Sequence, residues 1–578
     1  MARPGGLAET AWVAAAAANP VTVSPLPGTL DASPATQISF LGARGSSVAD
    51  VRVVGSRSGV HDGVLRKYST GTGESFLPSR PFAEGERVTV SARAASGSAR
   101  GREARSTFTI AYQAPVAQKP FPQNPGDSAA VQHYSSAPAL APSNVTITTP
   151  ARAGAAAGYL LLAPYQGRGA PGPMIADQSG GLVWFEPLPA GQAAANFEVA
   201  RYRGAPVLAW WQGHILELGF GQGEEVIYNS SYQHVASIRA GNGYQADLHS
   251  LKLTPQGTVW MDAYDPVRMN LQASGGVAGA VLSDSVIQEV DIKTGLVMWE
   301  WHALGHIPAA ESKNPLPASS YPWDYVHINS IDTGSHGDVL LSFRNTWSID
   351  DVDIHSGGIR WRIGGTRSSF RLGPGATFFW QHDATFQPDG LISLFDNGSD
   401  PAEEKQSRGL VLSSVARTHT VTLAKELVNP ERNLLASSQG NAQALPGGRW
   451  LLGYGGLPNF TEFDAQGHVL LDGTLGTGVQ SFTARLAPWV GRPVTAPALA
   501  AQPTAGGVRV AMSWNGATEV ASWRVLAGAS ASTLAPVASA RKSGFETIVV
   551  APSAGPYVAV QALDAAGRVL GVSATGKA

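Results

Sequence analysis

The chain contains no cysteine among its 578 residues, which excludes disulfide bonds, thiolate nucleophiles and zinc sites built on cysteine. Charged residues are also sparse, at 15% of the chain, and the formal net charge is only −2. This balance gives no reason to expect nucleic acid or an anionic membrane as a partner. No apolar run approaches the roughly 18 residues that a membrane-spanning helix needs.

Glycine and proline, in contrast, are abundant, with 66 and 39 residues, and hydrophobic residues make up 43% of the chain. Such a composition indicates a globular protein with many tight turns, as in all-β folds. The length exceeds what one hydrophobic core supports, so several domains are expected.

The two ends of the chain show the pattern of β-sandwiches. In both, short alternating strands are separated by turns rich in glycine, serine and aspartate. The alanine-rich segment before the N-terminal sandwich is typical either of a weak signal peptide, which would imply secretion, or of a disordered leader. The predicted domains are a leader at 1–20, an Ig-like sandwich at 21–113, a semi-rigid proline-rich linker at 114–144, a repeat region at 145–490 and a fibronectin III-like sandwich at 498–578.

The repeat region carries a recurring hairpin with an aspartate, a turn glycine and an aromatic residue. Clear copies span 177–184, 291–299 and 353–361, and a degenerate copy begins at Asp464. The second and third copies start 62 residues apart, and the flanking intervals of 114 and 111 residues are about twice that unit length, so the spacing yields six units. Units of this size, built from short strands, predict a six-bladed β-propeller, whereas a β-helix would need a shorter and stricter period.

Three consecutive units also share a histidine at the same position. His249, His327 and His382 each precede a turn glycine and a second strand, and a fourth unit begins with Asn441 instead. In a propeller blade the innermost strand lines the central channel. We therefore expect the three imidazoles to meet at one end of that channel.

The hairpin that follows each histidine brings further polar groups back to the same end. The last residue of a return strand lies beside the first residue of the strand before it, which places Arg344 next to His327. Tyr264 and Asn397 occupy the matching positions in their own units. Asn329, two residues after His327, is predicted to face the same side of its strand.

This set of groups suits chemistry on an oxyanion. An arginine fork binds sulfate or phosphate esters, and a neutral histidine can act as a nucleophile or as a general acid–base group. Donors such as Arg344 and Asn329 would stabilise charge on the non-bridging oxygens.

On these residues the repeat region resembles the arylsulfotransferase family, and within it the secreted branch of actinobacteria and fungi. The resemblance rests on Asp247-Leu-His249-Ser, Asp324-Tyr-Val-His327-Ile-Asn329-Ser-Ile331, Leu341-Ser-Phe-Arg344 and Gln381-His382-Asp383-Ala384. It implies a six-bladed propeller that moves a sulfuryl group from an aryl sulfate to a phenolic acceptor, with no nucleotide sulfate donor and no cofactor or metal. Periplasmic members with a disulfide exist in this family, and this chain departs from them because it has no cysteine.

The resemblance also assigns roles. His382 matches the nucleophile of a ping-pong cycle that passes through a sulfohistidine. The remaining family positions match groups that bind the sulfuryl oxygens and assist proton transfer: His249, His327, Asn329 and Arg344.

Aromatic residues next to the catalytic strands are interpreted as a mouth that sorts phenolic rings. Trp323, Phe379 and Trp380, together with Tyr264 and Asn397, are the predicted substrate-binding residues. The hairpin tryptophans are predicted to pack between blades instead. Four other histidines near turns or blade ends are expected to be solvated: His302, His306, His336 and His355.

Two alternatives remain open at this point. Three converging imidazoles could hold a divalent metal for hydrolysis or lyase chemistry. The chain could also be a secreted, non-enzymatic propeller that binds a glycan or a protein between adhesive sandwiches.

Overall fold

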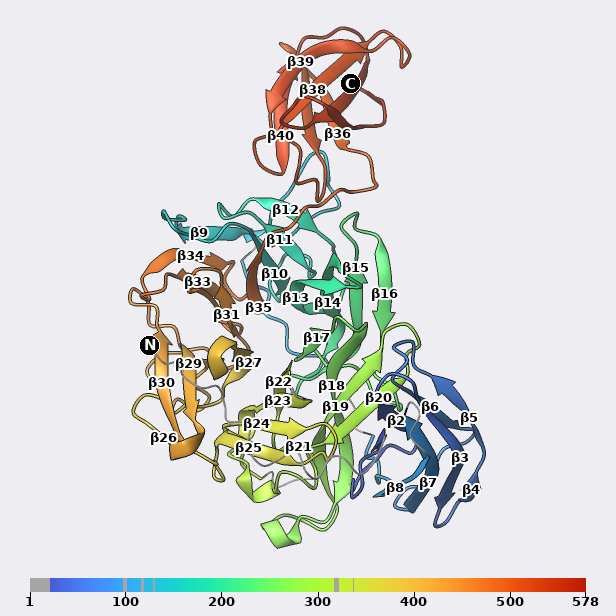
Figure 1. Ribbon diagram of the computed structural model, residues 1–578. Coiled ribbons are helices and arrows are strands. Elements are labelled where there is room, and N and C mark those ends of the chain that lie inside the picture. Colours follow the sequence, from blue (N-terminus) through green and yellow to red (C-terminus); the bar gives the residue numbers. More distant parts are fainter. Residues whose placement is uncertain (1–20, 97–100, 116–118, 128–129, 317–321, 336) are drawn as a thin grey trace, which may run out of the picture.

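The computed structural model describes residues 21–96, 101–115, 119–127, 130–316, 322–335 and 337–578, and it is almost entirely β (Figure 1). The leader predicted at 1–20 lies outside the described residues. A propeller stands between two β-sandwiches, which confirms the predicted fold class. Within the described ranges, no helix is long and apolar enough to cross a membrane.

Five of the six blades are antiparallel sheets whose strands follow the chain order from the channel outward. In each, the first strand lies innermost and the fourth lies at the rim (Figure 1). The blades comprise β13 (Ala193–Tyr202), β14 (Ala205–Ile215), β15 (Gly221–Tyr228) and β16 (His234–Ile238); β17 (Leu251–Leu253), β18 (Thr258–Met269), β19 (Ala280–Asp291) and β20 (Val297–His302); β22 (Ile328–Thr333), β23 (Asp338–Phe343), β24 (Ser348–Asp353) and β25 (Ile359–Gly364); β27 (His382–Gln387), β28 (Leu391–Asp396), β29 (Arg408–Val415) and β30 (Thr420–Leu427); and β31 (Asn441–Leu445), β32 (Arg449–Gly453), β33 (Asn459–Phe463) and β34 (Val469–Leu475).

Two of these blades carry a short additional strand that pairs in parallel. β21 (Trp323–Asp324) lies along β19, and β26 (Arg371–Leu372) lies along β30.

The sixth blade closes the ring by combining strands from both ends of the propeller. β35 (Gln480–Ala487) is its inner strand and pairs antiparallel with β10 (Tyr159–Tyr165), which is followed by β11 (Met174–Ala176) and β12 (Leu182–Phe185). β9 (Val145–Thr149) adds a fifth strand to the preceding blade by pairing with β34. The two ends of the propeller are thus hydrogen-bonded to each other through two different sheets.

The repeated hairpins form the rims of the blades, and the hairpin at 291–299 shows why. The carboxylate of Asp291 accepts hydrogen bonds from the Lys293 backbone N–H and the Thr294 hydroxyl, which fixes the turn between β19 and β20. Gly295 completes that turn with a φ of +70°. The buried Trp299 then donates its indole N–H to the carbonyl of Ile354 in the next blade, at 2.7 Å.

We expect Trp299→Ala to lower the free energy of unfolding by about 3–5 kcal/mol, because it empties a buried space between two blades and leaves the Ile354 carbonyl without its donor. Chemical denaturation followed by circular dichroism measures this loss. Trp514→Ala, which changes a partly exposed tryptophan of the C-terminal sandwich, is the control. Equal losses in both variants would show that inter-blade packing at Trp299 contributes no more to the free energy of unfolding than the packing of a partly exposed tryptophan.

The N-terminal sandwich docks on the rim of the blade β17–β20. Ser69 donates backbone and hydroxyl hydrogen bonds to Asp291, and the Ser39 hydroxyl bonds the Val297 carbonyl at 2.6 Å. Its strands form two sheets: β1 (Val21–Ser24), β2 (Ile38–Gly42), β6 (Gly73–Pro78) and β5 (Gly63–Lys67); and β4 (Gly59–His61), β3 (Ser46–Gly55), β7 (Arg87–Ser96) and β8 (Arg102–Thr109).

The C-terminal sandwich lies above the closing blade (Figure 1). Tyr232 of the propeller donates its hydroxyl hydrogen to the Gly516 carbonyl at 2.8 Å. The sandwich is built from β36 (Ala498–Thr504), β37 (Gly507–Ser513) and β40 (Glu546–Ala551), facing β39 (Ala535–Arg541), β38 (Ser522–Gly528), β41 (Tyr557–Leu563), β42 (Val569–Val572) and β43 (Gly576–Lys577).

The proline-rich segment at 114–144 packs along the propeller. Isolated bridges join Gln113 to Val267 and Pro120 to Leu216, and the Ser136 hydroxyl bonds Glu546 of the C-terminal sandwich at 2.7 Å. These contacts tie the segment to the propeller and to the C-terminal sandwich, although its composition predicts a semi-rigid spacer.

Candidate functional site

The structure brings the three repeat histidines together at one end of the channel. His249 lies two residues before the inner strand of its blade, His327 immediately precedes its inner strand, and His382 begins β27. The rings of His249 and His327 lie 4.7 Å apart, and Phe482 of the closing strand packs against His249 and His382 at 5.3 and 6.3 Å. All three imidazoles are buried, with exposed fractions of 5, 8 and 1%.

His249 and His327 each form a dyad with an aspartate of their own segment. Their Nδ1 atoms lie 2.5 Å from Asp247 Oδ2 and Asp324 Oδ2, respectively. Since a carboxylate acceptor fixes the Nδ1–H tautomer, each Nε2 is left as an acceptor. Within the described part of the chain no group hydrogen-bonds either Nε2, so both are available to accept a proton from a bound molecule.

His382 is held without a carboxylate. Its Nδ1 lies 2.7 Å from Asn397 Oδ1 and 3.1 Å from the Trp380 carbonyl oxygen, so two neutral acceptors hold the Nδ1 proton. Its Nε2 accepts the backbone N–H of Gln439, at 3.1 Å. Burial, and then the positive charge of Arg344, lower the pKa of His382 well below 6.5. The ring is therefore neutral, with an Nε2 lone pair that faces one backbone donor.

Arg344 returns beside His327, where its backbone N–H donates to the His327 carbonyl at 2.9 Å. It opens a short 3-10 turn, η5 (Arg344–Thr346), directly after β23. Its guanidinium stacks over the Trp380 ring at 4.7 Å, and Asn345 Oδ1 and the Ser437 carbonyl accept two of its N–H groups. The buried Nε has no partner among the described residues and is free to bind an anion.

The other return residues also reach their own histidines. The Asn397 side chain bonds His382 directly. This contact positions the imidazole. Tyr264 lies 5.8 Å from His249 and 5.6 Å from His327, and its hydroxyl bonds the Ile328 carbonyl at 2.5 Å.

The regular strand alternation expected for Asn329 is broken. His327 has a φ of +54°, and the pairing of β22 with β23 shifts between Ile328 and Ser330. The Asn329 amide donates to the Gln381 carbonyl of the next blade at 2.6 Å, whereas its buried Oδ1 has no partner in the described structure. Asn329 thus lines the channel below the histidines and joins two inner strands.

Several site residues adopt backbone conformations that are unfavourable for side chains. His327, Trp347, Trp380, Asp383 and Gln439 all have φ values between +53° and +64°. Each such residue costs about 1–3 kcal/mol, and strain of this kind concentrates at functional sites. The strain therefore indicates that this end of the channel is a functional site.

The predicted aromatic mouth is only partly assembled. Trp380 lies under Arg344, and Phe379 packs against the edge of Trp347 at 4.9 Å. Trp323 is a core residue: it is 5% exposed, packs beside Tyr325 and donates its indole N–H to the Asn314 carbonyl. Its position does not support a role in substrate contact.

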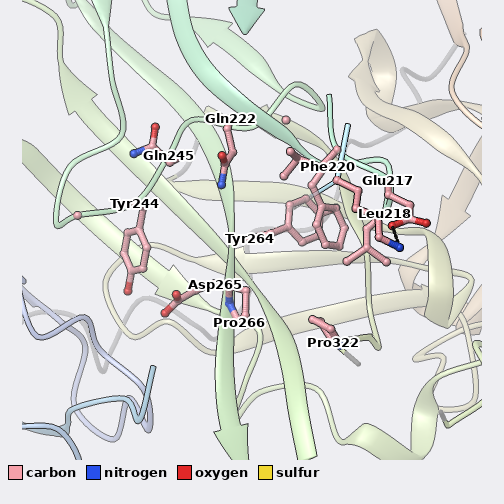
Figure 2. Close-up of a pocket in the computed structure, with 14 residues that line it drawn as sticks. Glu217, Leu218, Phe220, Gln222, Tyr244, Gln245, Tyr264, Asp265, Pro266 and Pro322 are labelled. Atoms are coloured by element: carbon pink, nitrogen blue, oxygen red, sulfur yellow. Dashed lines mark ion pairs between the residues drawn. The ribbon is translucent and has the colours of Figure 1, made fainter. Parts of the chain in front are cut away.

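A cavity of about 170 Å³ opens beside the histidines instead (Figure 2). Phe220 and Tyr264 stack at 3.9 Å in its wall, and Phe220 lies 6.0 Å from the His327 ring. The cavity is lined by Lys119, Leu216, Glu217, Leu218, Phe220, Gly221, Gln222, Gly243, Tyr244, Gln245, Tyr264, Asp265, Pro266 and Pro322. Its apolar surface is large enough to receive part of an aromatic ring system.

The part of the channel next to His249 and Asn329 is charged. It holds a cavity of about 90 Å³ that is crossed by ion pairs between inner strands. Lys252 Nζ lies 2.8 Å from Asp332, and Arg485 lies 3.5 Å from Asp383 and 3.8 Å from Glu198.

The histidines outside the channel differ in their exposure. His355 is exposed at a rim hairpin, as expected. His306 is only partly exposed, because its ring stacks on Trp301 at 4.7 Å. His336 lies outside the described residues.

Several residues of the site were not singled out in the sequence. Asp247 and Asp324 stand in the quoted motifs and could have been found there, because a carboxylate beside a histidine is a common orienting partner. Phe220, Gln439 and Phe482 come from other blades and have no local signal.

Comparison with known proteins gives one family. A family model described as arylsulfotransferase (ASST) matches residues 198–476. None of the curated proteins matches the chain. A solved structure of a protein of unknown function from Bacteroides caccae is 12% identical and covers 57% of this chain and 98% of its own, with a TM-score of 0.36. A catalytically inactive virginiamycin B lyase from Staphylococcus aureus with quinupristin is 10% identical and covers 64% of this chain and 96% of its own, with a TM-score of 0.31.

Proposed function

Because the propeller of this chain, over residues 198–476, belongs to the arylsulfotransferase family, we propose that it moves a sulfuryl group from an aryl sulfate ester to a phenolic acceptor through His382. One observation carries the proposal. A buried neutral imidazole, His382, lies under the positive field of Arg344 and beside two imidazoles whose Nε2 atoms can accept protons.

In the first half-reaction the Nε2 lone pair of His382 attacks the ester sulfur, and the bond between sulfur and the aryl oxygen breaks. The phenolate leaves with that electron pair. The positive charge that develops on the imidazole is stabilised by Asn397 Oδ1 and the Trp380 carbonyl oxygen, which accept hydrogen bonds from the Nδ1–H while the proton stays on Nδ1. Arg344 Nε and the Gln439 N–H, released from Nε2, donate to the sulfuryl oxygens.

In the second half-reaction an acceptor phenol takes the place of the first product. Its hydroxyl proton passes to the Nε2 of His327 or His249, its oxygen forms the new bond to sulfur, and the N–S electron pair returns to His382. The aspartate partners of the two helper histidines stabilise the imidazolium that results. The cavity beside Phe220 and Tyr264 supplies apolar surface for both aryl groups.

The proposal is tested with a chromogenic aryl sulfate, with and without added phenol. Release of the chromophore that depends on phenol, together with a sulfated phenol in equal amount, supports transfer. Release that is indifferent to the acceptor would identify a sulfatase and overturn the proposal.

A metal-dependent hydrolase is the second candidate, and one observation favours it. Ligand atoms of Asp247, His249 and Asp262 lie within 4.8 Å of one another, and both Asp262 oxygens lack a partner in the described structure. Transfer that survives prolonged treatment with a chelator supports the sulfohistidine route, whereas activity that Zn²⁺ restores to the stripped wild-type chain but not to Asp262→Asn supports the metal route.

The two half-reactions should respond differently to pH. Burial, and then the charge of Arg344, keep the pKa of His382 well below 6.5, so the nucleophile stays neutral as the pH falls from 7.5 to 6. An unperturbed imidazole would be about three-quarters protonated at pH 6. The rate of burst release of the first phenol is therefore expected not to change between pH 7.5 and pH 6.

Transfer to the acceptor should decline over the same interval. Burial raises the pKa of Asp324 to about 7, so the carboxylate that supports His327 as a base is present above pH 7 and lost as the pH falls through it. Stopped-flow measurement of each half-reaction separates the two profiles. A burst rate that falls with an apparent pKa near 6.5 would contradict the proposed state of His382.

Export of the protein from the cell is part of the same proposal. Residues 1–20 have the pattern of a weak signal peptide, and N-terminal sequencing of protein recovered from culture medium would check export.

A further inference from the structure

A second cluster of chemistry-bearing side chains lies where the N-terminal sandwich meets the propeller. Asp31 comes from the loop between β1 and β2, Asp284 from β19 and His302 from the end of β20. All three side chains are buried, with exposed fractions of 3, 0 and 1%. The expectation that His302 is solvated is therefore wrong, because the docked sandwich covers it.

The three side chains are arranged as ligands around a common point. His302 Nδ1 lies 3.1 Å from Asp284 Oδ2 and 3.2 Å from Asp31 Oδ1, and the ligand atoms of all three lie within 4.8 Å of one another. Tetrahedral Zn²⁺ with bonds of about 2.0–2.1 Å separates neighbouring ligand atoms by about 3.3 Å. The two distances from His302 match that separation.

The cluster contains more carboxyl groups than imidazoles. Glu300 Oε1 lies 3.2 Å from His302 Nε2, and Asp265 is a further buried carboxyl group in this region. Three carboxyl groups thus contact one imidazole, and a bound divalent cation would hold them together.

Unpartnered polar atoms provide an independent indication of a missing ligand. Among the described residues, Asp31 Oδ2, Asp265 Oδ2 and the Tyr244 hydroxyl have no hydrogen-bond partner, and Asp31 Oδ1 has only its ion pair with His302. Asp31, Asp265 and Tyr244 are at most 6% exposed. In Figure 2 the Tyr244 hydroxyl and the Asp265 carboxylate lie on the same side of the aromatic cavity, and the Tyr244 ring is 6.3 Å from that of His302. Buried polar atoms of this kind are normally satisfied by protein, water or an ion.

We propose that Asp31, Asp284 and His302 bind one Zn²⁺ ion, which fastens the N-terminal sandwich to the blade β17–β20. Two carboxylates and an imidazole with a fourth position left for water form a donor set that zinc accepts, whereas Ca²⁺ prefers oxygen ligands alone. The ion is structural, and it is separate from the three repeat histidines.

The site would also support the catalytic end of the propeller from behind. Ser283 and Ser285 flank Asp284 in β19. Ser283 pairs with Asp324, the partner of His327, and the Ser285 hydroxyl accepts the Ile328 N–H at 3.3 Å. An ion on Asp284 therefore steadies the strand against which the His327 dyad is built.

Zinc binding by the full-length chain tests the proposal. Protein stripped by a chelator and then re-equilibrated with Zn²⁺ is expected to retain about one ion per chain by elemental analysis, with a melting temperature raised by several degrees. Asp31→Asn, Asp284→Asn and His302→Asn should each lose the ion. His468→Asn is the matched control, because it removes an exposed imidazole that pairs with Asp464 at 2.9 Å and should leave zinc binding unchanged.

A second experiment distinguishes this site from the other group of potential metal ligands, Asp247, His249 and Asp262. Asp262→Asn disrupts the group at Asp247 and His249 and should keep the ion. Should the Asp284 and His302 variants fail to fold, hydrogen exchange of the wild-type chain decides: zinc should slow exchange in β20 and in the loop around Asp31. The proposal is overturned if the chain retains no zinc, if Asp262→Asn removes it, or if exchange slows only around Asp247.

Discussion

Replacing His382 by asparagine is expected to reduce sulfuryl transfer by a factor of about 10⁴ or more, since a nucleophile acts as a unit with its supporting groups and loses nearly the whole covalent route when removed. The asparagine can still occupy the space between Asn397 and Gln439, so the fold should persist. Turnover of a chromogenic aryl sulfate in the presence of phenol measures the loss.

Trapping of the intermediate makes the same prediction specific. Wild-type protein mixed with donor in the absence of acceptor should carry one sulfuryl group on the peptide that contains His382, and the asparagine variant should carry none. The exposed His468→Asn variant should behave like wild type. Full turnover by His382→Asn, or a label on His249 or His327, would assign the nucleophile to another imidazole.

Arg344→Ala should lower kcat by about 10²–10³, which corresponds to about 2.7–4 kcal/mol of transition-state stabilisation. Its guanidinium is fixed by Asn345, by the Ser437 carbonyl and by stacking on Trp380, so the unpartnered Nε reaches the sulfuryl oxygens without reorganisation. Lysine keeps the charge but neither the planar fork nor the stacking, and Arg344→Lys is expected to recover only a small part of the rate.

A matched control lies in the same blade. Arg360 forms an exposed ion pair with Asp353 at the rim hairpin, and Arg360→Ala should leave kcat unchanged and stability within about 0.5 kcal/mol. Steady-state kinetics of the three variants, at donor concentrations above and below KM, measure the effects. An Arg344→Lys variant as active as wild type would show that Arg344 acts by charge alone.

The convergence of the repeat histidines could be predicted because it depends on local sequence, namely the turn glycines and the hairpins that follow each histidine. Turn glycines and the hairpins after His249, His327 and His382 set strand length and direction, and a return strand necessarily ends beside the start of its partner. The same reasoning located Arg344 beside His327, and the backbone bond between them has the predicted pairing.

Three features escaped sequence reasoning for different physical reasons. The side on which Asn329 lies depends on a positive φ at His327 and on a shift of register, neither of which changes residue composition. The donor on His382 Nε2 is the backbone of Gln439, whose side-chain type carries no information about it. The burial of His302 depends on how a separate domain docks, and a strand pattern cannot reveal that contact.

Ring closure has a consequence for how the protein matures on the ribosome. The inner strand of the closing blade, β35, contains Phe482, which packs against His249 and His382, and its partner β10 is made roughly 300 residues earlier. At synthesis rates of about 5–20 residues per second, the first strands wait roughly 15–65 s for the last one. Throughout that interval the nascent chain exposes an unpaired sheet edge and an unfinished histidine cluster, so activity begins only after the chain has been synthesised past residue 487.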